Sequence, residues 1–128
     1  MNPVVRRTAE KIFGNEDRIH IIEPLNVFDF HNFLKRCHLV LTDSGGIQEE
    51  APALGKPVLV LRDTTERPEG IEAGTLLLAG TSEKKIYDSF CSLLNNSRKY
   101  QKMSTAKNPY GDGYASRRIA DILEKSLR

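Results

Sequence analysis

A short apolar run followed by a turn of small residues constrains this chain most strongly. Residues 39–41 (Leu-Val-Leu) have the continuous apolar character of a strand buried on both faces in a parallel sheet. Residues 43–46 (Asp-Ser-Gly-Gly) interrupt that run and allow the backbone to approach a ligand without hindrance from Cβ atoms. A helix that begins at Ser44 or Gly45 would present free N–H groups and a positive dipole end, which suits an anion.

Two interpretations of this turn are open on the local pattern. Glu49 and Glu50 follow within the first turns of the helix, where one carboxylate could accept hydrogen bonds from hydroxyls. A phosphate site beside an acceptor for a diol indicates a nucleotide. The alternative is a capped strand-to-helix turn that binds no ligand.

The rest of the chain alternates between strands and helices, which predicts an α/β layer with a mainly parallel sheet. We expect further strands at residues 19–22, 57–61 and 75–79. We expect helices at residues 3–13 (capped by Asn2), 27–37, 45–54, 68–73, 82–94, 97–106 and 115–127, with Pro52 kinking or shortening the third. Ligands of such sheets bind beyond the carboxyl ends of the strands. The polar loops at residues 43–46 and 62–70 both follow strands, which favours the nucleotide interpretation.

Composition limits the classes of function. The 128 residues suffice for one modest domain, and the net charge of +2 gives no field that would favour nucleic acid or membrane binding. The first residues lack the pattern of a signal peptide. Cys37 and Cys91 are far apart, without the spacing of metal ligands, so we expect no metal site but buried free thiols in a reducing cytoplasm.

Longer motifs resemble a known family. They are residues 41–52 (LTDSGGIQEEAP), 54–69 (LGKPVLVLRDTTERPE), 72–75 (EAGT) and 108–113 (NPYGDG). Together they resemble the non-hydrolysing UDP-N-acetylglucosamine 2-epimerases over essentially the whole chain. The resemblance implies a Rossmann-like, mainly parallel sheet with helices on both faces. Residues 1–128 would form a single partial UDP-binding C-terminal domain of a GT-B-like two-domain fold, with the N-terminal catalytic domain absent.

The resemblance also implies the roles of individual residues. Ser44 and Gly46 would bind the diphosphate, Glu50 would accept from the ribose hydroxyls, Arg67 would reach the diphosphate, and Phe30 would pack beside uracil. Some family members carry glutamine where this chain has Leu25, so no side-chain contact to uracil is expected there. The implied UDP-binding residues are Ser44, Gly45, Gly46, Glu50, Arg67 and Phe30, with Asp43, Glu66 and Glu69 in support.

The implied reaction interconverts UDP-GlcNAc and UDP-ManNAc by elimination and re-addition of UDP, without a cofactor. We assign no catalytic residue in this chain, because His20 in a strand, and His31 and His38 on or after a helix, are better explained as structural or solvated. We expect the UDP-binding half of a cytoplasmic enzyme of cell-envelope polysaccharide biosynthesis, inactive alone. Its partners would be UDP, a UDP-N-acetylhexosamine, and either a second copy or a separate N-terminal half, with no nucleic acid and no membrane.

Two other hypotheses compete with this one. The chain could be a stand-alone module that binds UDP or a UDP-sugar without catalysis. It could also be a glycosyltransferase fragment of the same fold, which the signature at residues 43–50 disfavours.

Overall fold

The computed structural model describes residues 3–127, which divide into two compact units with the boundary between Phe33 and Leu34. The first unit contains α1 (Pro3–Phe13) and an irregular segment, and the boundary falls within α2 (Val27–Arg36). Proline is the first residue of α1, where its missing N–H removes no helical hydrogen bond. The predicted cap at Asn2 lies outside the described residues.

The second unit is built on a parallel sheet of three short strands in the order β1-β2-β3. The strands are β1 (Val40–Thr42), β2 (Val58–Val60) and β3 (Leu76–Leu78). Val40 pairs with Val58, and Val58 pairs with Leu76, so the three strands begin at the same level of the sheet. The central strand β2 is fully buried, in agreement with its uninterrupted apolar sequence.

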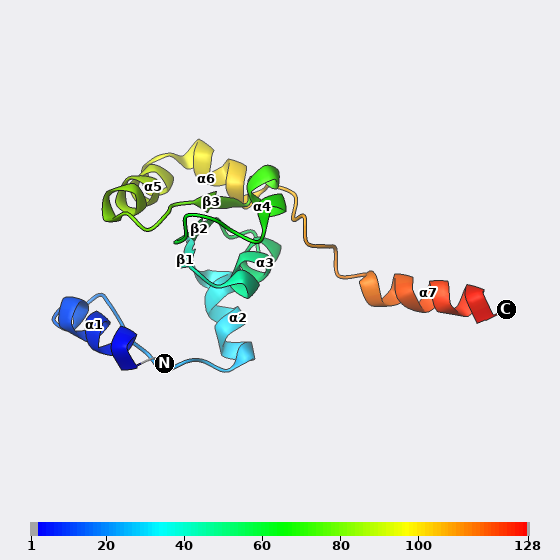
Figure 1. The fold of residues 1–128 in the computed structure, drawn as a ribbon, viewed down its shortest axis with the longest axis horizontal. Coiled ribbons are helices and arrows are strands. Elements are labelled where there is room, and N and C mark those ends of the chain that lie inside the picture. Colours follow the sequence, from blue (N-terminus) through cyan, green and yellow to red (C-terminus); the bar gives the residue numbers. More distant parts are fainter. Residues whose placement is uncertain (1–2, 128) are drawn as a thin grey trace. The chain divides into compact units, whose positions relative to one another are not determined.

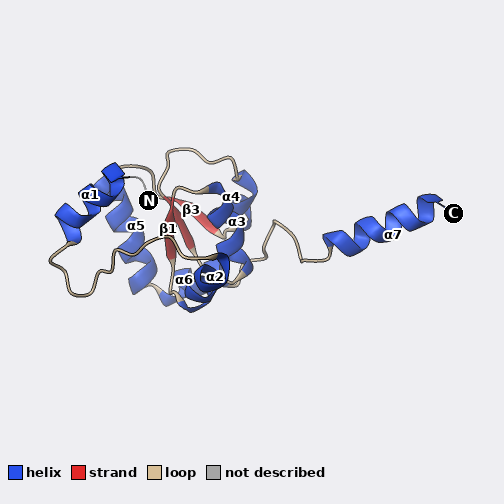
Figure 2. Ribbon diagram, turned by 90° about the horizontal axis from the view of Figure 1, so that it is seen from below, coloured by secondary structure: helices blue, strands red, loops and turns tan. Residues whose placement is uncertain are grey.

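Helices cover both faces of this sheet. After β1 comes α3 (Gly45–Ala53), after β2 comes α4 (Pro68–Ala73), and after β3 come α5 (Glu83–Asn95) and α6 (Ser97–Ser104). Figure 1 shows α5 and α6 above the strands and α3 below them, and the strands between the helices are visible again in Figure 2. The predicted α/β class, with a parallel sheet covered on both faces, is therefore confirmed.

The core lies between the sheet and the α5–α6 pair. Leu59 of β2 packs with Ala79, which follows β3, and with Leu93 and Met103 of α5 and α6. Burial of a leucine side chain contributes roughly 1.5–3 kcal/mol relative to exposure. Leu61, which follows β2, packs against this core, and the polar loop at residues 62–70 begins directly after it.

The last helix, α7 (Ala115–Leu127), has the predicted bounds. Its apolar stripe of Ile119, Ile122, Leu123 and Leu127 is exposed to solvent in the described structure. Asp112, in the loop before α7, accepts two hydrogen bonds from the Arg118 guanidinium.

The predicted strand at residues 19–22 is wrong. These residues are irregular, and the Ile19 N–H donates to the Glu16 carbonyl in a turn. A strand requires a neighbouring strand for its backbone hydrogen bonds, and within residues 3–127 no strand pairs with this segment. The apolar pattern alone could not reveal that. His20 is consequently an exposed residue of an irregular segment.

The expected effect of Pro52 is confirmed, whereas the cysteines are less buried than expected. Pro52 lies in the last turn of α3, which ends one residue later, so the proline shortens the helix as expected. Both cysteines are free but only half-buried. The Cys37 thiol donates to the Leu34 carbonyl at 3.1 Å, and its partial burial raises its pKa.

Candidate functional site

The turn between β1 and α3 is shaped by a side chain of the strand. The buried Thr42 hydroxyl accepts a hydrogen bond from the Ser44 N–H at 3.0 Å, and Ser44 is the extended residue that precedes the helix, with φ −81° and ψ 129°. The Ser44 side chain makes no capping hydrogen bond to α3. Its hydroxyl is therefore not committed to the helix, and the first N–H groups of α3 point toward the turn.

Glycine at the first two positions of α3 leaves space that other side chains approach. A Cβ atom on Gly45 would lie 3.2 Å from Glu66 Oε1 and 3.9 Å from Arg67 Nη2. A Cβ atom on Gly46 would lie 3.8 Å from Glu50 Oε1. The structure thus brings Glu50, Glu66 and Arg67 around the amino end of α3.

The Arg67 guanidinium is held by two groups at this site. Its Nε donates to the carboxylate of Glu49, and its Nη1 donates to the Glu66 carbonyl at 3.1 Å. The hydrogen bond to Glu49 is the largest cause of a raised Arg67 pKa, so this side chain remains a cation. Its Nη2 is the nitrogen that lies nearest to Gly45.

The loop that carries Arg67 is anchored to the interior through Thr65. The Thr65 hydroxyl accepts from the Arg67 N–H at 3.1 Å and donates to Gln48 Oε1 at 2.6 Å. Gln48 is fully buried in α3, and its Nε2 has no hydrogen-bond partner within residues 3–127. The backbone of the loop is therefore connected to α3 by a short chain of hydrogen bonds.

Carboxylates outnumber guanidinium groups around this helix end. A backbone hydrogen bond lowers the pKa of Glu66, and so does the hydrogen bond that its carboxylate accepts from Arg62 at 2.6 Å. Asp43 is exposed in the turn, and Glu69 is in the first turn of α4, close enough to contribute to the raised Arg67 pKa. A phosphate here would be bound by N–H groups and Arg67 rather than by a broad positive field.

Phe30 belongs to the other unit, so its predicted place beside uracil stays a prediction. The side chain is half-buried in α2, and its ring centroid lies 6.1 Å from that of His31.

The interpretation of His38 as structural agrees with its contacts. Its ring stacks on Tyr100 at 4.2 Å, and the Tyr100 hydroxyl donates to its carbonyl at 2.8 Å. His38 precedes β1, whereas the turn at Ser44 follows that strand.

The contacts that α3 makes with the loop carrying Arg67 were not predicted from the sequence. Glu49 was considered as an acceptor for hydroxyls, but here it pairs with Arg67. Glu49 and Arg67 are 18 residues apart, and Gln48 and Thr65 are 17 apart, so neither contact follows from helical spacing.

Tyr110 also lies beside this loop. Its hydroxyl is buried and has no hydrogen-bond partner of ordinary geometry within residues 3–127, and a Cβ atom on Gly70 would clash with its oxygen. Burial, with the nearby carboxylates of Glu69 and Glu49, raises the Tyr110 pKa. The loop at residues 108–113 therefore packs against the start of α4.

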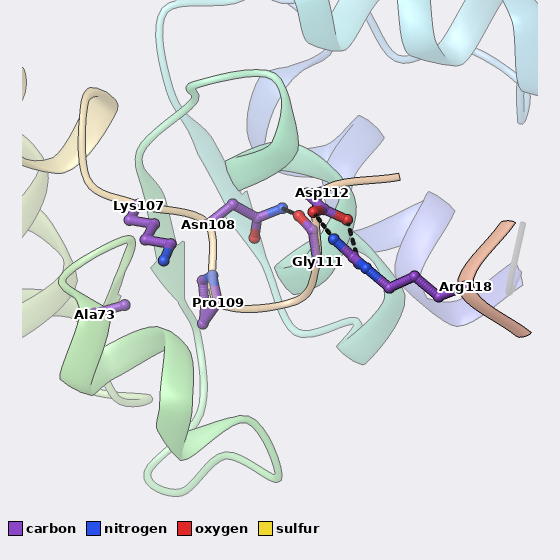
Figure 3. A pocket seen from close by; sticks show the side chains of 7 residues that line it. All are labelled: Ala73, Lys107, Asn108, Pro109, Gly111, Asp112 and Arg118. Carbon is purple, nitrogen blue, oxygen red and sulfur yellow. Dashed lines mark hydrogen bonds and ion pairs between the residues drawn. The ribbon is translucent and has the colours of Figure 1, made fainter. Parts of the chain in front are cut away.

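A large hollow in the structure lies away from the amino end of α3. It has a volume of about 740 Å³ and is shown in Figure 3. Its lining consists of Ala73, Lys107, Asn108, Pro109, Gly111, Asp112 and Arg118. A second hollow of about 350 Å³ borders Thr65 and Pro68. None of the residues predicted to bind UDP lines either hollow, so the chemistry of α3, not cavity size, identifies the candidate site.

Residues 3–127 contain neither a cluster of metal ligands nor a membrane-spanning helix. No group of three or more His, Cys, Asp or Glu side chains is placed to hold a metal ion there. No helix in that range combines the length and apolar character needed to cross a membrane.

Comparison with known proteins gives consistent matches over nearly the whole chain. The family model described as UDP-N-acetylglucosamine 2-epimerase matches residues 1–124. The UDP-N-acetylglucosamine 2-epimerase of Bacillus subtilis (strain 168) is 67% identical over 123 residues, which are 96% of this chain and 32% of that protein.

Solved structures show the same relationship. The S. aureus MnaA-UDP co-structure superposes with a TM-score of 0.93 at 57% identity, over 98% of this chain and 34% of that one. The UDP-GlcNAc 2-epimerase from Neisseria meningitidis bound to UDP-GlcNAc gives a TM-score of 0.89 at 47% identity, with the same coverage. The chain therefore spans about a third of the length of the relatives it matches.

Proposed function

This chain belongs to the UDP-N-acetylglucosamine 2-epimerase family, and on that basis we propose that it supplies the UDP-binding part of such an enzyme. The reaction would interconvert UDP-GlcNAc and UDP-ManNAc. The observation that carries the proposal is the amino end of α3, where uncapped N–H groups, the Ser44 hydroxyl and Arg67 Nη2 meet.

Each group at this site has a role suited to its chemistry. The N–H groups of Gly45 and Gly46 and the hydroxyl of Ser44 donate to the diphosphate, and the Arg67 guanidinium adds a charge-assisted contact. Glu50 accepts hydrogen bonds from the two ribose hydroxyls, since an ionised carboxylate offers acceptors only. Asp43, Glu66 and Glu69 orient the arginines and the loop, and Phe30 packs beside uracil.

The proposed reaction has two halves. In the first, a base removes the proton at C2 while the bond between C1 and the UDP oxygen breaks, which leaves UDP and an unsaturated sugar. In the second, a proton is added to the opposite face of C2 and the UDP oxygen re-forms its bond to C1. Ser44, Gly46 and Arg67 stabilise the charge that develops on the departing diphosphate.

The groups that move the C2 proton are proposed to lie outside these 128 residues. A general base must come within hydrogen-bond reach of the proton it removes. His38 is engaged with Tyr100 at the opposite end of β1, and the carboxylate of Glu49 is paired with Arg67. UDP, a UDP-N-acetylhexosamine, and a second copy or a separate N-terminal half are the proposed partners. A cytoplasmic role in cell-envelope polysaccharide biosynthesis is part of the same proposal.

Proton exchange at C2 tests this assignment. The chain is incubated with UDP-GlcNAc in deuterated water, and the C2 proton and line widths of the nucleotide are followed by NMR. We expect broadening of the nucleotide signals without loss of the C2 proton. Loss of that proton at an enzymatic rate would show that the chain holds the proton-transfer groups itself, and unaltered line widths would contradict binding.

A chimaera separates the enzyme part from a stand-alone binding module. Residues 1–124 of this chain replace the matching third of the Bacillus subtilis relative, and epimerisation is assayed. Retained activity supports the proposal, whereas a folded but inactive chimaera that still binds UDP favours the stand-alone module.

A further inference from the structure

Two consecutive residues of α3 reach different parts of the loop that carries Arg67. Gln48 accepts a hydrogen bond from the Thr65 hydroxyl, and Glu49 accepts one from Arg67 Nε. Both contacts join residues 17 or 18 positions apart in the sequence. The same helix whose amino end faces Arg67 therefore also holds the loop from which Arg67 extends.

The contact through Gln48 fixes the backbone of the loop. Burial of a side-chain amide is unfavourable unless the amide is hydrogen-bonded, and Gln48 is fully buried with one bonded atom, Oε1. That atom accepts from Thr65, whose oxygen in turn accepts from the Arg67 N–H. The position of the Arg67 backbone is thereby defined relative to α3.

The contact through Glu49 fixes the orientation of the guanidinium group. This group is planar, so anchoring two of its nitrogens determines the direction of the third. Nε is bonded to Glu49 and Nη1 to the Glu66 carbonyl, which leaves Nη2 beside Gly45.

We propose that Gln48 and Glu49 are positioning residues, which hold Arg67 Nη2 at the amino end of α3 ready to contact a diphosphate. An arginine that is already oriented loses little side-chain entropy when it binds phosphate, so preorganisation increases affinity. This inference rests on the proposed function, because UDP is the ligand whose diphosphate Arg67 would meet.

A competing possibility predicts the opposite change in the affinity for UDP when the Glu49 carboxylate is removed. If the Glu49 carboxylate competed with phosphate for Arg67, its removal would strengthen the binding of UDP. In the positioning account the carboxylate occupies Nε and leaves Nη2 to the ligand, so its removal weakens binding.

Calorimetric titrations with UDP and with uridine, on the 128-residue chain, distinguish these accounts. We expect Glu49→Ala and Thr65→Val each to raise the Kd for UDP about tenfold while the Kd for uridine stays within about twofold. Glu72→Ala and Thr64→Val are matched controls that change the same chemical groups away from Arg67, and we expect the Kd for UDP to stay within about twofold. If Glu49→Ala does not fold, Glu49→Gln, which keeps a side-chain acceptor but loses the charge, is tested in its place.

A double-mutant cycle shows whether the effect passes through Arg67. In an Arg67→Ala background, Glu49→Ala should change the Kd for UDP by less than about twofold. Tighter binding of UDP by Glu49→Ala, equal weakening for UDP and uridine, or an undiminished effect in the Arg67→Ala background would each overturn the inference.

A readout without nucleotide separates this inference from the proposed function. In the wild-type chain, the Arg67 Nε–H should exchange slowly with solvent and give a resolved NMR signal, which Glu49→Ala abolishes. If UDP does not bind but this signal behaves as expected, the proposed function fails and the orientation of Arg67 by Glu49 stands. Rapid exchange in the wild-type chain would overturn the orientation itself.

Discussion

Arg67 donates from Nε to the carboxylate of Glu49, a residue one helical turn after the glycine that faces Arg67 Nη2. The pair thus joins the loop after β2 to the helix after β1. In a parallel sheet these two segments start at the same edge, where ligands bind. The contact explains how a cation is held at the amino end of α3 among several carboxylates.

Replacement of Arg67 by lysine should weaken the binding of UDP. Lysine keeps the charge but cannot use one nitrogen for Glu49 and present another to phosphate, because it has a single terminal ammonium group. We expect the Kd for UDP to rise about tenfold while that for uridine is unchanged. Calorimetry with UDP and with uridine measures the difference, and an equal loss for both would argue against a phosphate contact.

Replacement of Ser44 by alanine should weaken the binding of UDP while leaving the stability of the fold nearly unchanged. Loss of a serine that caps a helix commonly costs about 1 kcal/mol, but the Ser44 side chain makes no capping hydrogen bond. We expect the free energy of unfolding in urea to change by less than about 0.5 kcal/mol. The affinity for UDP should fall severalfold. A large loss of stability would show that the hydroxyl serves the helix instead.

Two glycine substitutions should have contrasting effects. A Cβ atom at Gly70 would collide with the Tyr110 hydroxyl and Leu76, so Gly70→Ala should destabilise the fold by about 1–3 kcal/mol. A Cβ atom at Gly46 would make only an ordinary contact with Glu50, so Gly46→Ala should leave stability intact or raise it. The same methyl group should hinder the approach of the diphosphate. Urea unfolding combined with UDP titration checks both substitutions.

The Tyr110 hydroxyl should make the stability of the fold depend on pH only in the alkaline range. Its pKa is raised in the fold, so the native state retains a proton that the unfolded chain loses first. The contribution is fully present below the unfolded pKa of about 10 and decreases as the pH rises through the folded value. Tyr110→Phe should therefore lose less stability than the wild type between about pH 9.5 and 11. Parallel pH profiles of the two proteins would contradict this expectation.

Local pattern predicted most of the second unit. The uninterrupted apolar runs at β1, β2 and β3 lie in the parallel sheet, and the stripe of α7 has the expected bounds. The predicted strands at residues 57–61 and 75–79 were one residue too long at each end, and the one at residues 39–41 was shifted by one residue, since strand ends depend on pairing with neighbours. The strand at residues 19–22 failed for the same reason, because an apolar segment becomes a strand only where a partner strand is present.

The candidate site was predictable where its residues are close in sequence and less so elsewhere. The turn at Ser44 and the two glycines follow from a strand that leads into a helix. The pairs Glu49–Arg67 and Gln48–Thr65 link helix α3 to the loop after β2, and no periodicity along the chain predicts such contacts. Tyr110 was noted as part of a loop, but its approach to Gly70 depends on tertiary packing.

The most direct test of the central claim is a titration of the ¹⁵N-labelled chain with UDP, followed by amide NMR. We predict that the largest shifts occur at the N–H groups of Gly45, Gly46 and Ile47 and at Arg67 Nε. Absence of shifts, or shifts centred on the hollow lined by Lys107 and Asp112, would contradict the claim that α3 binds the diphosphate.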